Sequence, residues 1–249
     1  RVIAGTGSGG LREQITLQAA RLFRVPDGID LVEASALLMT YGTTIHGLKD
    51  RGDIAAGQTV LVLGAAGGVG LSAVELAKAW GCRVVAAVSS EEKAAVAREA
   101  GADETVIYGR PPFDRDQSKA LAQQFKDAVG PNGADIVYDV VGGDYSEPAL
   151  RAIAWEGRFL VVGFPAGIAR MPLNLTLLKS CDIRGVFWGA FTAREPGKNA
   201  AHIAELFDLW KAGKIRPRIS ETYPLARAHE AIAKLESRQA IGKLVVTMD

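Results

Sequence analysis

Cysteine and histidine are scarce in this chain, which has two cysteines and three histidines among its 249 residues. Cys82 and Cys181 stand 99 positions apart, so they cannot form a zinc cluster between them and do not suggest a disulfide scaffold. None of His46, His202 and His229 has a cysteine or a second histidine at metal-ligand spacing. We therefore expect no metal site, a reducing compartment with the cytoplasm as the default, two cysteines in the core, and His202 and His229 at the surface.

An excess of either charge is also missing. Lysine and arginine number 29 against 28 aspartate and glutamate residues, which leaves a formal net charge of +1, and 48% of the residues are hydrophobic. This balance excludes a disordered polyelectrolyte and a basic nucleic-acid binder. The length allows one large domain or one and a fraction.

A long, purely hydrophobic run is absent as well. The longest uncharged stretch, 54–74, has 21 residues, but five glycines and Gln58 divide it into a short apolar run, a turn and a helix start. Residues 1–10 contain no apolar core of signal-peptide length. We expect no membrane partner. Because the chain lacks an initiator methionine and opens on a strand-like run, we expect part of a longer protein.

Glycine is the abundant residue, at 28 of 249, which implies turns and close backbone approaches. After Gln58, short apolar runs typical of buried parallel strands alternate with helical patterns. Strands are expected at 60–63, 83–88, 105–107, 136–138, 158–162 and 183–188. Helices are expected at 69–80, 91–100, 116–129, 145–153 and 199–212. This alternation predicts right-handed crossovers and an α/β open sheet, doubly wound as in the Rossmann fold.

The two ends of the chain depart from this alternation. Before Pro26, short strand-like runs at 2–4, 14–17 and 22–25 are separated by glycines, and 31–48 has helical spacing with a break near Tyr41 and Gly42. The tail predicts a strand at 219–223, a helix at 225–236 and a strand at 243–247. We expect the tail to return to the beginning, so that 1–44 and 214–249 form parts of one domain around a nucleotide-binding domain at 45–213.

The most informative segment runs from the strand at 60–63 through a glycine turn into a helix. The first amides of such a helix lack intrahelical partners and attract anions. Gly67 would let the main chain approach a pyrophosphate, and Gly70 would let the helix pack closely on the strand, as in a dinucleotide fingerprint. Ala65 stands where the first glycine of that fingerprint usually falls. The alternative is a glycine-rich turn that binds no ligand.

Coenzyme choice should be decided at the end of the second strand, about 20 residues further on. Ser89, Ser90 and Lys93 offer two hydroxyls and an ammonium there in place of the usual carboxylate, which favours the 2′-phosphate of NADP. Alternatively, Ser90 caps the next helix with Glu91 and Glu92 in its first turn. Both interpretations can hold together, and a glutamate that folded toward the ribose would favour NAD instead.

No nucleophile elbow of the form Gly-x-Ser-x-Gly occurs in the sequence. Covalent catalysis is therefore not supported. Hydride transfer needs little from the protein beyond placing a nicotinamide against an acceptor and excluding water. The lack of an evident acid–base pair is thus compatible with an oxidoreductase.

Several motifs together resemble one family. They are Ala-Leu-Leu-Met-Thr-Tyr-Gly-Thr-Thr-Ile-His-Gly-Leu at 36–48, Gly-Gln-Thr-Val-Leu-Val-Leu-Gly-Ala-Ala-Gly-Gly-Val-Gly at 57–70, Gly-Ala-Asp at 101–103, Tyr-Asp-Val-Val-Gly-Gly at 138–143 and Gly-Lys at 242–243. The chain resembles, over nearly its whole length, the zinc-independent quinone oxidoreductase (zeta-crystallin-like) branch of the medium-chain dehydrogenase/reductases. The resemblance implies a Rossmann domain with remnants of a GroES-like β-barrel catalytic domain formed by the two chain ends.

The resemblance also assigns roles to residues. It implies that Gly67, Gly68, Val69 and Gly70 bind pyrophosphate, that Ser90, Lys93, Tyr108 and Arg238 surround the 2′-phosphate, and that Thr43, Gly163, Phe164 and Phe187 lie beside the nicotinamide and its ribose. Zinc-dependent relatives carry a metal-binding cysteine four residues before that threonine. Met39 occupies the position here, which implies hydride transfer without zinc. Ile45 replaces a tyrosine of many relatives, and nearby Tyr41 is the candidate for positioning the acceptor or donating a proton.

These expectations lead to one functional prediction with two alternatives. The prediction is an NADPH-dependent, zinc-independent oxidoreductase that transfers hydride to a quinone or a similar conjugated acceptor. The alternatives are an NADPH-dependent enone or enoyl thioester reductase and a non-catalytic, crystallin-like NADPH-binding protein. The family also implies a homodimer formed through the sheet edge at 183–188, whose apolar run would otherwise be exposed.

Overall fold

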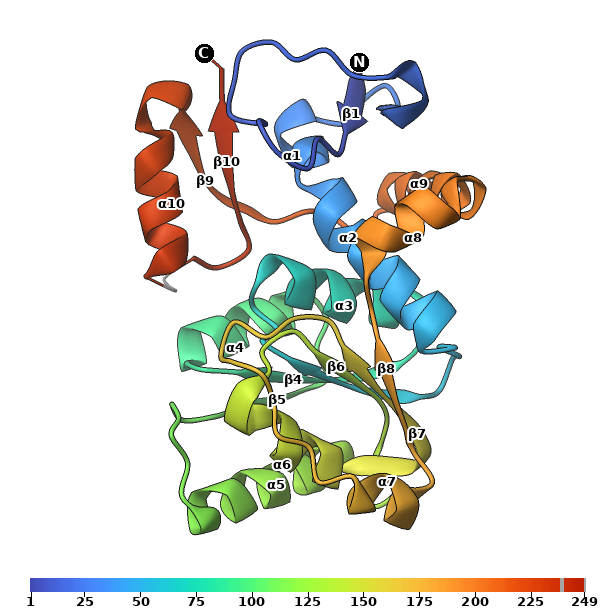
Figure 1. Cartoon of the computed structure of the whole chain (residues 1–249), viewed down its shortest axis with the longest axis vertical. Coiled ribbons are helices and arrows are strands. Elements are labelled where there is room, and N and C mark those ends of the chain that lie inside the picture. Colours follow the sequence, from blue (N-terminus) through green and yellow to red (C-terminus); the bar gives the residue numbers. More distant parts are fainter. Residues whose placement is uncertain (238–239, 249) are drawn as a thin grey trace.

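Six parallel strands form the centre of the molecule. In the computed structural model, which describes residues 1–237 and 240–248, they lie in the order β5-β4-β3-β6-β7-β8 (Figure 1). Their bounds are β3 Thr59–Leu63, β4 Arg83–Val88, β5 Glu104–Ile107, β6 Ala134–Asp139, β7 Ile153–Val161 and β8 Asp182–Gly185. The order turns outward on both sides of β3, so a switch point lies between β3 and β6, where open α/β sheets bind ligands.

Helices cover both faces of this sheet. They are α3 Gly68–Ala79, α4 Glu91–Glu99, α5 Arg115–Val129, α6 Ser146–Arg151, α7 Asn174–Lys179, α8 Trp188–Arg194 and α9 Pro196–Lys211. Along β3, Val60 and Val62 pack into one core with α3 and α9, whereas Leu61 and Leu63 pack into a second core with α5 and α6. Burial on both faces explains the nearly continuous apolar strands. The predicted doubly wound α/β fold is confirmed.

Both chain ends lie together above this sheet (Figure 1). The antiparallel pair β1 (Val2–Ala4) and β2 (Leu22–Arg24) lies near the parallel pair β9 (Ile219–Pro224) and β10 (Lys243–Thr247), and α1 (Leu31–Ser35) contacts β10. The helix α10 (Ala228–Glu236) connects β9 to β10. The tail thus returns to the beginning of the chain. The domain limits 1–44, 45–213 and 214–249 stay a prediction.

Three local predictions were wrong. Residues 14–17 form no strand, because they are largely exposed and pair with nothing in the described part of the chain. The helical break falls at Ala36, between α1 and α2 (Leu37–Ile45), not at Gly42. Gly42 is helical, and its missing side chain makes room for Trp188, whose ring would lie 2.8 Å from an added Cβ. The last strand of the sheet, β8, ends at Gly185, and Trp188 begins α8 instead.

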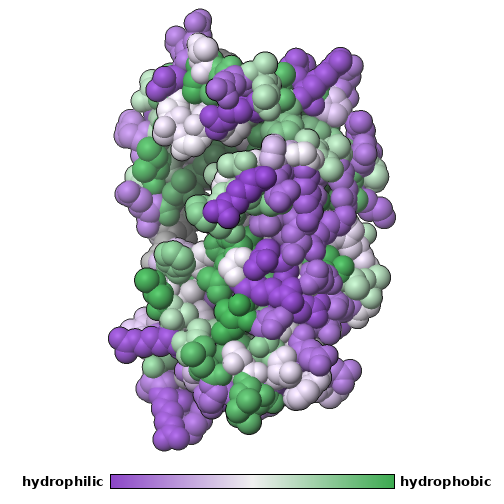
Figure 2. All heavy atoms as spheres, turned by 45° about the vertical axis from the view of Figure 1, so that its right-hand side comes forward, coloured by the Kyte–Doolittle hydropathy of each residue, from purple (hydrophilic) through white to green (hydrophobic). Residues whose placement is uncertain are grey.

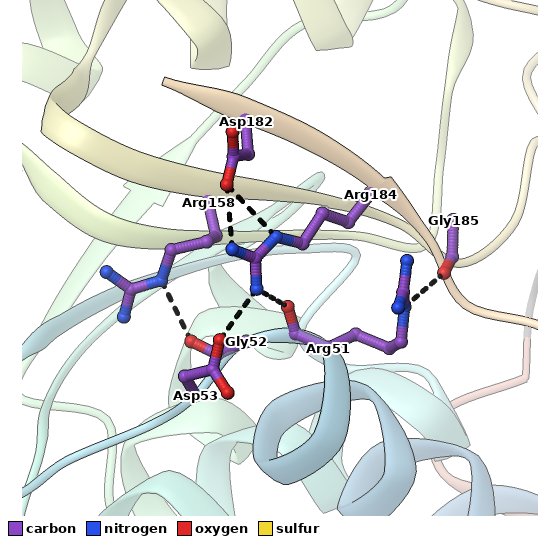
Figure 3. A network of polar contacts seen from close by, with 7 residues as sticks. All are labelled: Arg51, Gly52, Asp53, Arg158, Asp182, Arg184 and Gly185. Carbon is purple, nitrogen blue, oxygen red and sulfur yellow. Dashed lines mark hydrogen bonds and ion pairs between the residues drawn. The ribbon is translucent and has the colours of Figure 1, made fainter. Parts of the chain in front are cut away.

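An exposed ionic network ties the edge strand β8 to the turn that follows η2 (His46–Arg51), a π-helical continuation of α2 (Figure 3). Arg184 lies 2.7 Å from carboxylate oxygens of both Asp182 and Asp53, and it donates to the carbonyl of Arg51 at 2.8 Å. Arg158 on the neighbouring strand donates to the carbonyl of Gly52 at 2.9 Å. The network therefore fixes the lower end of the α2–η2 helix against the sheet.

Candidate nucleotide-binding site

Two glycines of the turn between β3 and α3 have different steric surroundings. A Cβ on Gly70 would lie 2.1 Å from the carbonyl oxygen of Gly64 and 2.7 Å from the Cα of Ala65, so only glycine fits. A Cβ on Gly67 would meet only the same carbonyl oxygen, at 3.5 Å. Packing within the chain therefore demands a glycine at 70 but not at 67. The open side of Gly67 fits close approach of a ligand to the main chain.

The positive end of α3 opens at the same place. Gly67 is the N-cap and supplies no side-chain acceptor to the amides of Gly68, Val69 and Gly70 that follow it. Uncapped amides together with the helix dipole attract an anion. These residues are therefore suited to hold a phosphate group.

A residue from the opposite end of the sequence joins this turn. Gly242 pairs with Gly67 and donates to the carbonyl of Ala66 at 3.0 Å. The next residue, Lys243, lies with its Cδ 2.6 Å from the point where a Cβ of Gly68 would be. Burial lowers the pKa of Lys243, and among the described residues no carboxylate pairs with its amine. A partly buried cation beside a positive helix end favours an anionic ligand.

Lys243 was not among the predicted site residues. The motif Gly242-Lys243 contributed to the family resemblance, but no role was assigned to it. Its place beside the glycine turn depends on how the tail returns to the sheet. The return of the tail was predicted, but no local pattern shows which of its residues packs against the turn, and in the sequence Lys243 resembles an ordinary residue of a short strand.

Three predicted residues gather at the end of β4. Ser90 caps α4 by accepting from the amide of Lys93 at 3.3 Å, as the alternative interpretation expected. The Lys93 ammonium donates to the hydroxyl of Ser89 at 3.1 Å. Glu91 pairs with Arg98 further along the helix. The hydroxyls and the ammonium thus lie together, while the carboxylate of Glu91 is bound elsewhere.

Tyr108 lies at the end of β5 and forms part of the wall next to the turn. It is 8% exposed, and its ring centroid lies 4.6 Å from that of Tyr145. Burial raises its pKa, and its hydroxyl lies at the backbone of Gly64. The side chain is thus fixed at the glycine turn. Arg238, predicted to join it, lies outside the described residues.

The residues predicted beside the nicotinamide come from three elements. Thr43 on α2 is partly buried, and its hydroxyl donates to the carbonyl of Met39 at 2.6 Å. Gly163 and Phe164 follow β7, and Phe187 follows β8. The two phenylalanine rings are 59% and 75% exposed, respectively. Large uncovered rings at the carboxyl ends of parallel strands are suited to hold the flat, largely apolar part of a ligand.

The position of Tyr41 does not support the expected role in proton donation. Tyr41 is 2% exposed, and its hydroxyl donates to Glu75 on α3 at 2.5 Å. The same carboxylate accepts from the amide of Arg216 at 3.3 Å. Burial raises the pKa of Glu75 to about 7 and raises the pKa of Tyr41 as well. The tyrosine therefore joins α2 to α3 in the interior.

Of the four predicted positions of cysteine and histidine side chains, three were correct and one was wrong. Cys82 and Cys181 are free and buried, and His229 is exposed. His202 is only 6% exposed, contrary to the prediction, because its face of α9 packs against η2 and α8. The described residues hold no group of three or more histidine, cysteine, aspartate or glutamate side chains arranged for a metal ion.

Comparison with known proteins agrees with the resemblance. Residues 68–205 match the family described as zinc-binding dehydrogenase. A quinone oxidoreductase-like protein 2 homolog of Nematostella vectensis is 34% identical over 247 residues, which are 98% of this chain and 65% of that protein. A quinone oxidoreductase of Pseudomonas aeruginosa is 34% identical over 250 residues, which are 99% of this chain and 74% of that protein.

Solved structures give the same result. A mycobacterial protein in complex with NADPH superposes with a TM-score of 0.83 at 31% identity, covering 92% of this chain and 68% of that one. The chain spans about two thirds of the length of the relatives it matches. The matched family and the fold show that the chain belongs to the medium-chain dehydrogenase/reductase superfamily, and the named relatives show that it belongs to the zinc-independent quinone oxidoreductase branch, a branch of enzymes.

Proposed function

We propose that this protein is an NADPH-dependent oxidoreductase that transfers hydride, without zinc, to a quinone or a similar conjugated acceptor. The observation that carries the proposal is the positive, open turn at Gly67. There the uncapped amides of α3 and the amine of Lys243 meet with no carboxylate of the described chain paired to that amine. Such a turn suits a pyrophosphate bridge, which a nicotinamide dinucleotide supplies.

Preference for NADPH over NADH rests on the end of β4. A 2′-phosphate there would meet the hydroxyl of Ser89 and the ammonium of Lys93, which lie 3.1 Å apart. A carboxylate that could hold free ribose hydroxyls is available less readily, because Glu91 pairs with Arg98. The relative that was solved with NADPH supports the same choice.

In this mechanism the protein binds the coenzyme, orients its nicotinamide and excludes water from the reacting atoms. The amides of 68–70 hold the pyrophosphate, and Lys243 offsets its charge. Thr43, Phe164 and Phe187 flank the place for the nicotinamide, where the rings shield the reacting atoms from water. Bound NADPH supplies the hydride. The quinone takes up that hydride as the hydroquinone anion, which gains one proton from water once it leaves the shielded site and so becomes the hydroquinone.

Two measurements test the proposal. Fluorescence titration should show tighter binding of NADPH than of NADH, and equal affinities would contradict the coenzyme preference. Steady oxidation of NADPH with 1,4-naphthoquinone should then exceed that with a simple enone or an enoyl thioester. Faster turnover of the enone or the thioester would favour the alternative, an enone or enoyl thioester reductase. Tight NADPH binding without turnover of any acceptor would favour a binding protein.

A homodimer through β8 forms part of the proposal. This strand is the edge of the sheet. Its neighbour β7 carries Trp155 and the preceding helix α7 carries Leu177 and Leu178, which are 67%, 81% and 65% exposed. Figure 2 shows hydrophobic side chains on the lower half of the face that carries this edge. Unpaired edges and apolar patches favour pairing with a second copy. Light scattering that gives the monomer mass at micromolar concentration would contradict the dimer.

The proposed location is the cytoplasm. The two free, buried thiols suit a reducing compartment. Within 1–237 and 240–248, no helix is long and apolar enough to cross a bilayer.

A further inference from the structure

The helix α8 starts at the candidate site. It follows Phe187, the exposed ring after β8, and its first residue, Trp188, covers Gly42 of α2. The indole Nε1 of Trp188 donates to the side chain of Asn199 on α9 at 3.2 Å. The position of Phe187 therefore depends on how firmly α8 is held against α2 and α9.

A second attachment of α8 is a stack of three rings. Phe191 stacks against two imidazoles, with its ring centroid 4.0 Å from that of His46 and 5.6 Å from that of His202. The interplanar angles are 17° and 23°, and all three residues are buried. We call this set, His46, Phe191 and His202, the ring stack. It joins α2 and its continuation η2 to α8 and α9.

One carboxylate contacts both imidazoles of the ring stack. Asp50 accepts from Nδ1 of His46 at 2.8 Å and from the ammonium of Lys198 at 2.7 Å. Its oxygen Oδ1 lies 3.5 Å from Nε2 of His202. Burial opposes ionisation of Asp50, but the bonds from Lys198 and His46 outweigh it and lower the pKa of this carboxyl. Asp50 is thus charged at neutral pH.

His202 is less well satisfied than His46. Its Nδ1 is a buried polar atom with no hydrogen-bond partner in the described structure. A proton added at this atom would create a buried N–H group without an acceptor, which is costly. Burial accordingly lowers the pKa of His202, so the neutral ring is the form that the packed structure favours.

The other charges around His202 do not remove this cost. Asp50 and His46 face it from η2, and Lys198 and Glu205 from its own helix α9. The two carboxylates favour the charged ring, while Lys198 and His46 oppose it. Glu205 is already bound by Lys49, whose ammonium lies 2.6 Å from both of its oxygens. The third element, α8, contributes the uncharged ring of Phe191.

We propose that the ring stack is a proton-sensitive seat for α8, in which His202 is a positioning residue that holds Phe187 at the nicotinamide side while its imidazole is neutral. Protonation in mild acid releases α8, because a locally opened state exposes the imidazole and restores its ordinary affinity for a proton. Phe187 then loses its fixed place. The inference depends on the proposed function only for the role of Phe187.

Amide hydrogen exchange read by mass spectrometry tests this seat without any cofactor. After correction for the intrinsic effect of pH, protection of 186–194 in the wild type should fall by up to about tenfold between about pH 6.5 and pH 5.5, since one proton is linked to opening. In His202→Gln, which cannot titrate, protection should stay constant. The matched control His229→Gln removes an exposed histidine and should behave as the wild type does.

Two results would overturn the proposal: a wild-type segment whose protection does not change, or an equal fall in wild type and His202→Gln. If His202→Gln fails to fold, NMR titration of the wild type tests the proposal instead. The imidazole of His202 and the amides of 187–191 should then share one midpoint, and separate midpoints would contradict the seat.

A binding measurement links the seat to the site. NADP⁺ should lose affinity in mild acid more in the wild type than in His202→Gln, and comparison at equal pH cancels the titration of the phosphate itself. An equal loss in both proteins would contradict a positioning role. If NADP⁺ fails to bind at neutral pH while the exchange result holds, the proposed function fails and the seat stands.

Discussion

The phosphate end and the nicotinamide end of the candidate nucleotide-binding site are built differently. The frame of the phosphate end consists of consecutive residues, from Leu63 to Gly70, whose backbone is packed too tightly for a side chain at position 70, and Lys243 joins it from the tail. The nicotinamide end depends on α2, which is held from both sides by buried titratable groups. Glu75 with Tyr41 joins α2 to α3, and His46 with His202 joins it to α8 and α9.

This difference has a consequence for how each end responds to its surroundings. Steric packing at the glycine turn does not change with pH, so the phosphate end should keep its form over a wide range. The contacts that hold α2 change with protonation. Glu75, whose pKa is raised, favours the folded state in acid, whereas His202, whose pKa is lowered, opposes it. Four substitutions test this contrast, two of them within the turn itself.

The largest effect should come from Gly70→Ala. The added Cβ would lie 2.1 Å from the carbonyl oxygen of Gly64, and because that atom belongs to the backbone, the strand or the helix must shift. Such overpacking costs about 3 kcal/mol or more. Thermal or urea unfolding measures the loss, with Gly197→Ala as the control, because Gly197 is also a helical glycine without a positive φ but has nothing within 4 Å of an added Cβ. Equal losses in both variants would contradict a steric origin at Gly70.

The next effect concerns the pH dependence of stability. Glu75 has a folded pKa of about 7 against an ordinary 4.5, so the folded state keeps a proton that the unfolded state has released between these values. Stability should therefore fall as pH rises from 4.5 to 7, by about 2 to 3 kcal/mol at most. In Glu75→Gln the side-chain oxygen still accepts from Tyr41 and Arg216, and this contribution disappears.

The measurement for Glu75 is urea unfolding at several pH values. Glu75→Gln should be more stable than the wild type at pH 8 and about equal to it below pH 4.5. Glu92→Gln, at an exposed position of α4, is the matched control and should follow the wild type. A wild-type curve parallel to that of Glu75→Gln would show that this carboxyl is not perturbed. The same series in the His202→Gln background separates the opposite contributions of Glu75 and His202 to the pH dependence of stability.

Gly67→Ala should separate ligand binding from packing. The backbone at Gly67 (φ −78°, ψ 165°) suits alanine, and the new Cβ would meet only one atom, at 3.5 Å. We expect a change in unfolding free energy below about 1 kcal/mol but a loss of NADPH affinity of about tenfold or more, since the methyl group occupies the approach to the pyrophosphate. Unchanged affinity would remove the main support for a dinucleotide at this turn.

The same contrast explains what the sequence could reveal. The sheet, the glycine turn and the cap at Ser90 follow from local rules: apolar strand runs, glycine after a strand, and serine before a helix with acids in its first turn. Lys243 and His202 do not, because their surroundings come from segments far away in the chain. The sequence predicts His202 at the surface, but in the structure α8 and η2 pack on it. The sequence predicts Tyr41 in the site, but in the structure its hydroxyl donates to Glu75.

The smallest effect should come from Lys93→Ala. Lys93 is partly exposed, and within the described part of the chain its ammonium donates only to Ser89, at 3.1 Å, so stability should change by less than about 0.5 kcal/mol. A phosphate contact by an exposed ammonium is worth about 1 kcal/mol, which corresponds to a loss of NADPH affinity of about fivefold. NADH affinity should be nearly unchanged, since it carries no 2′-phosphate. Lys119→Ala, an exposed lysine on α5, controls for net charge. If Lys93→Ala lowers the affinities for NADPH and NADH equally, the ammonium contacts a part of the coenzyme that both forms share, and other residues of the site must then determine the choice of coenzyme.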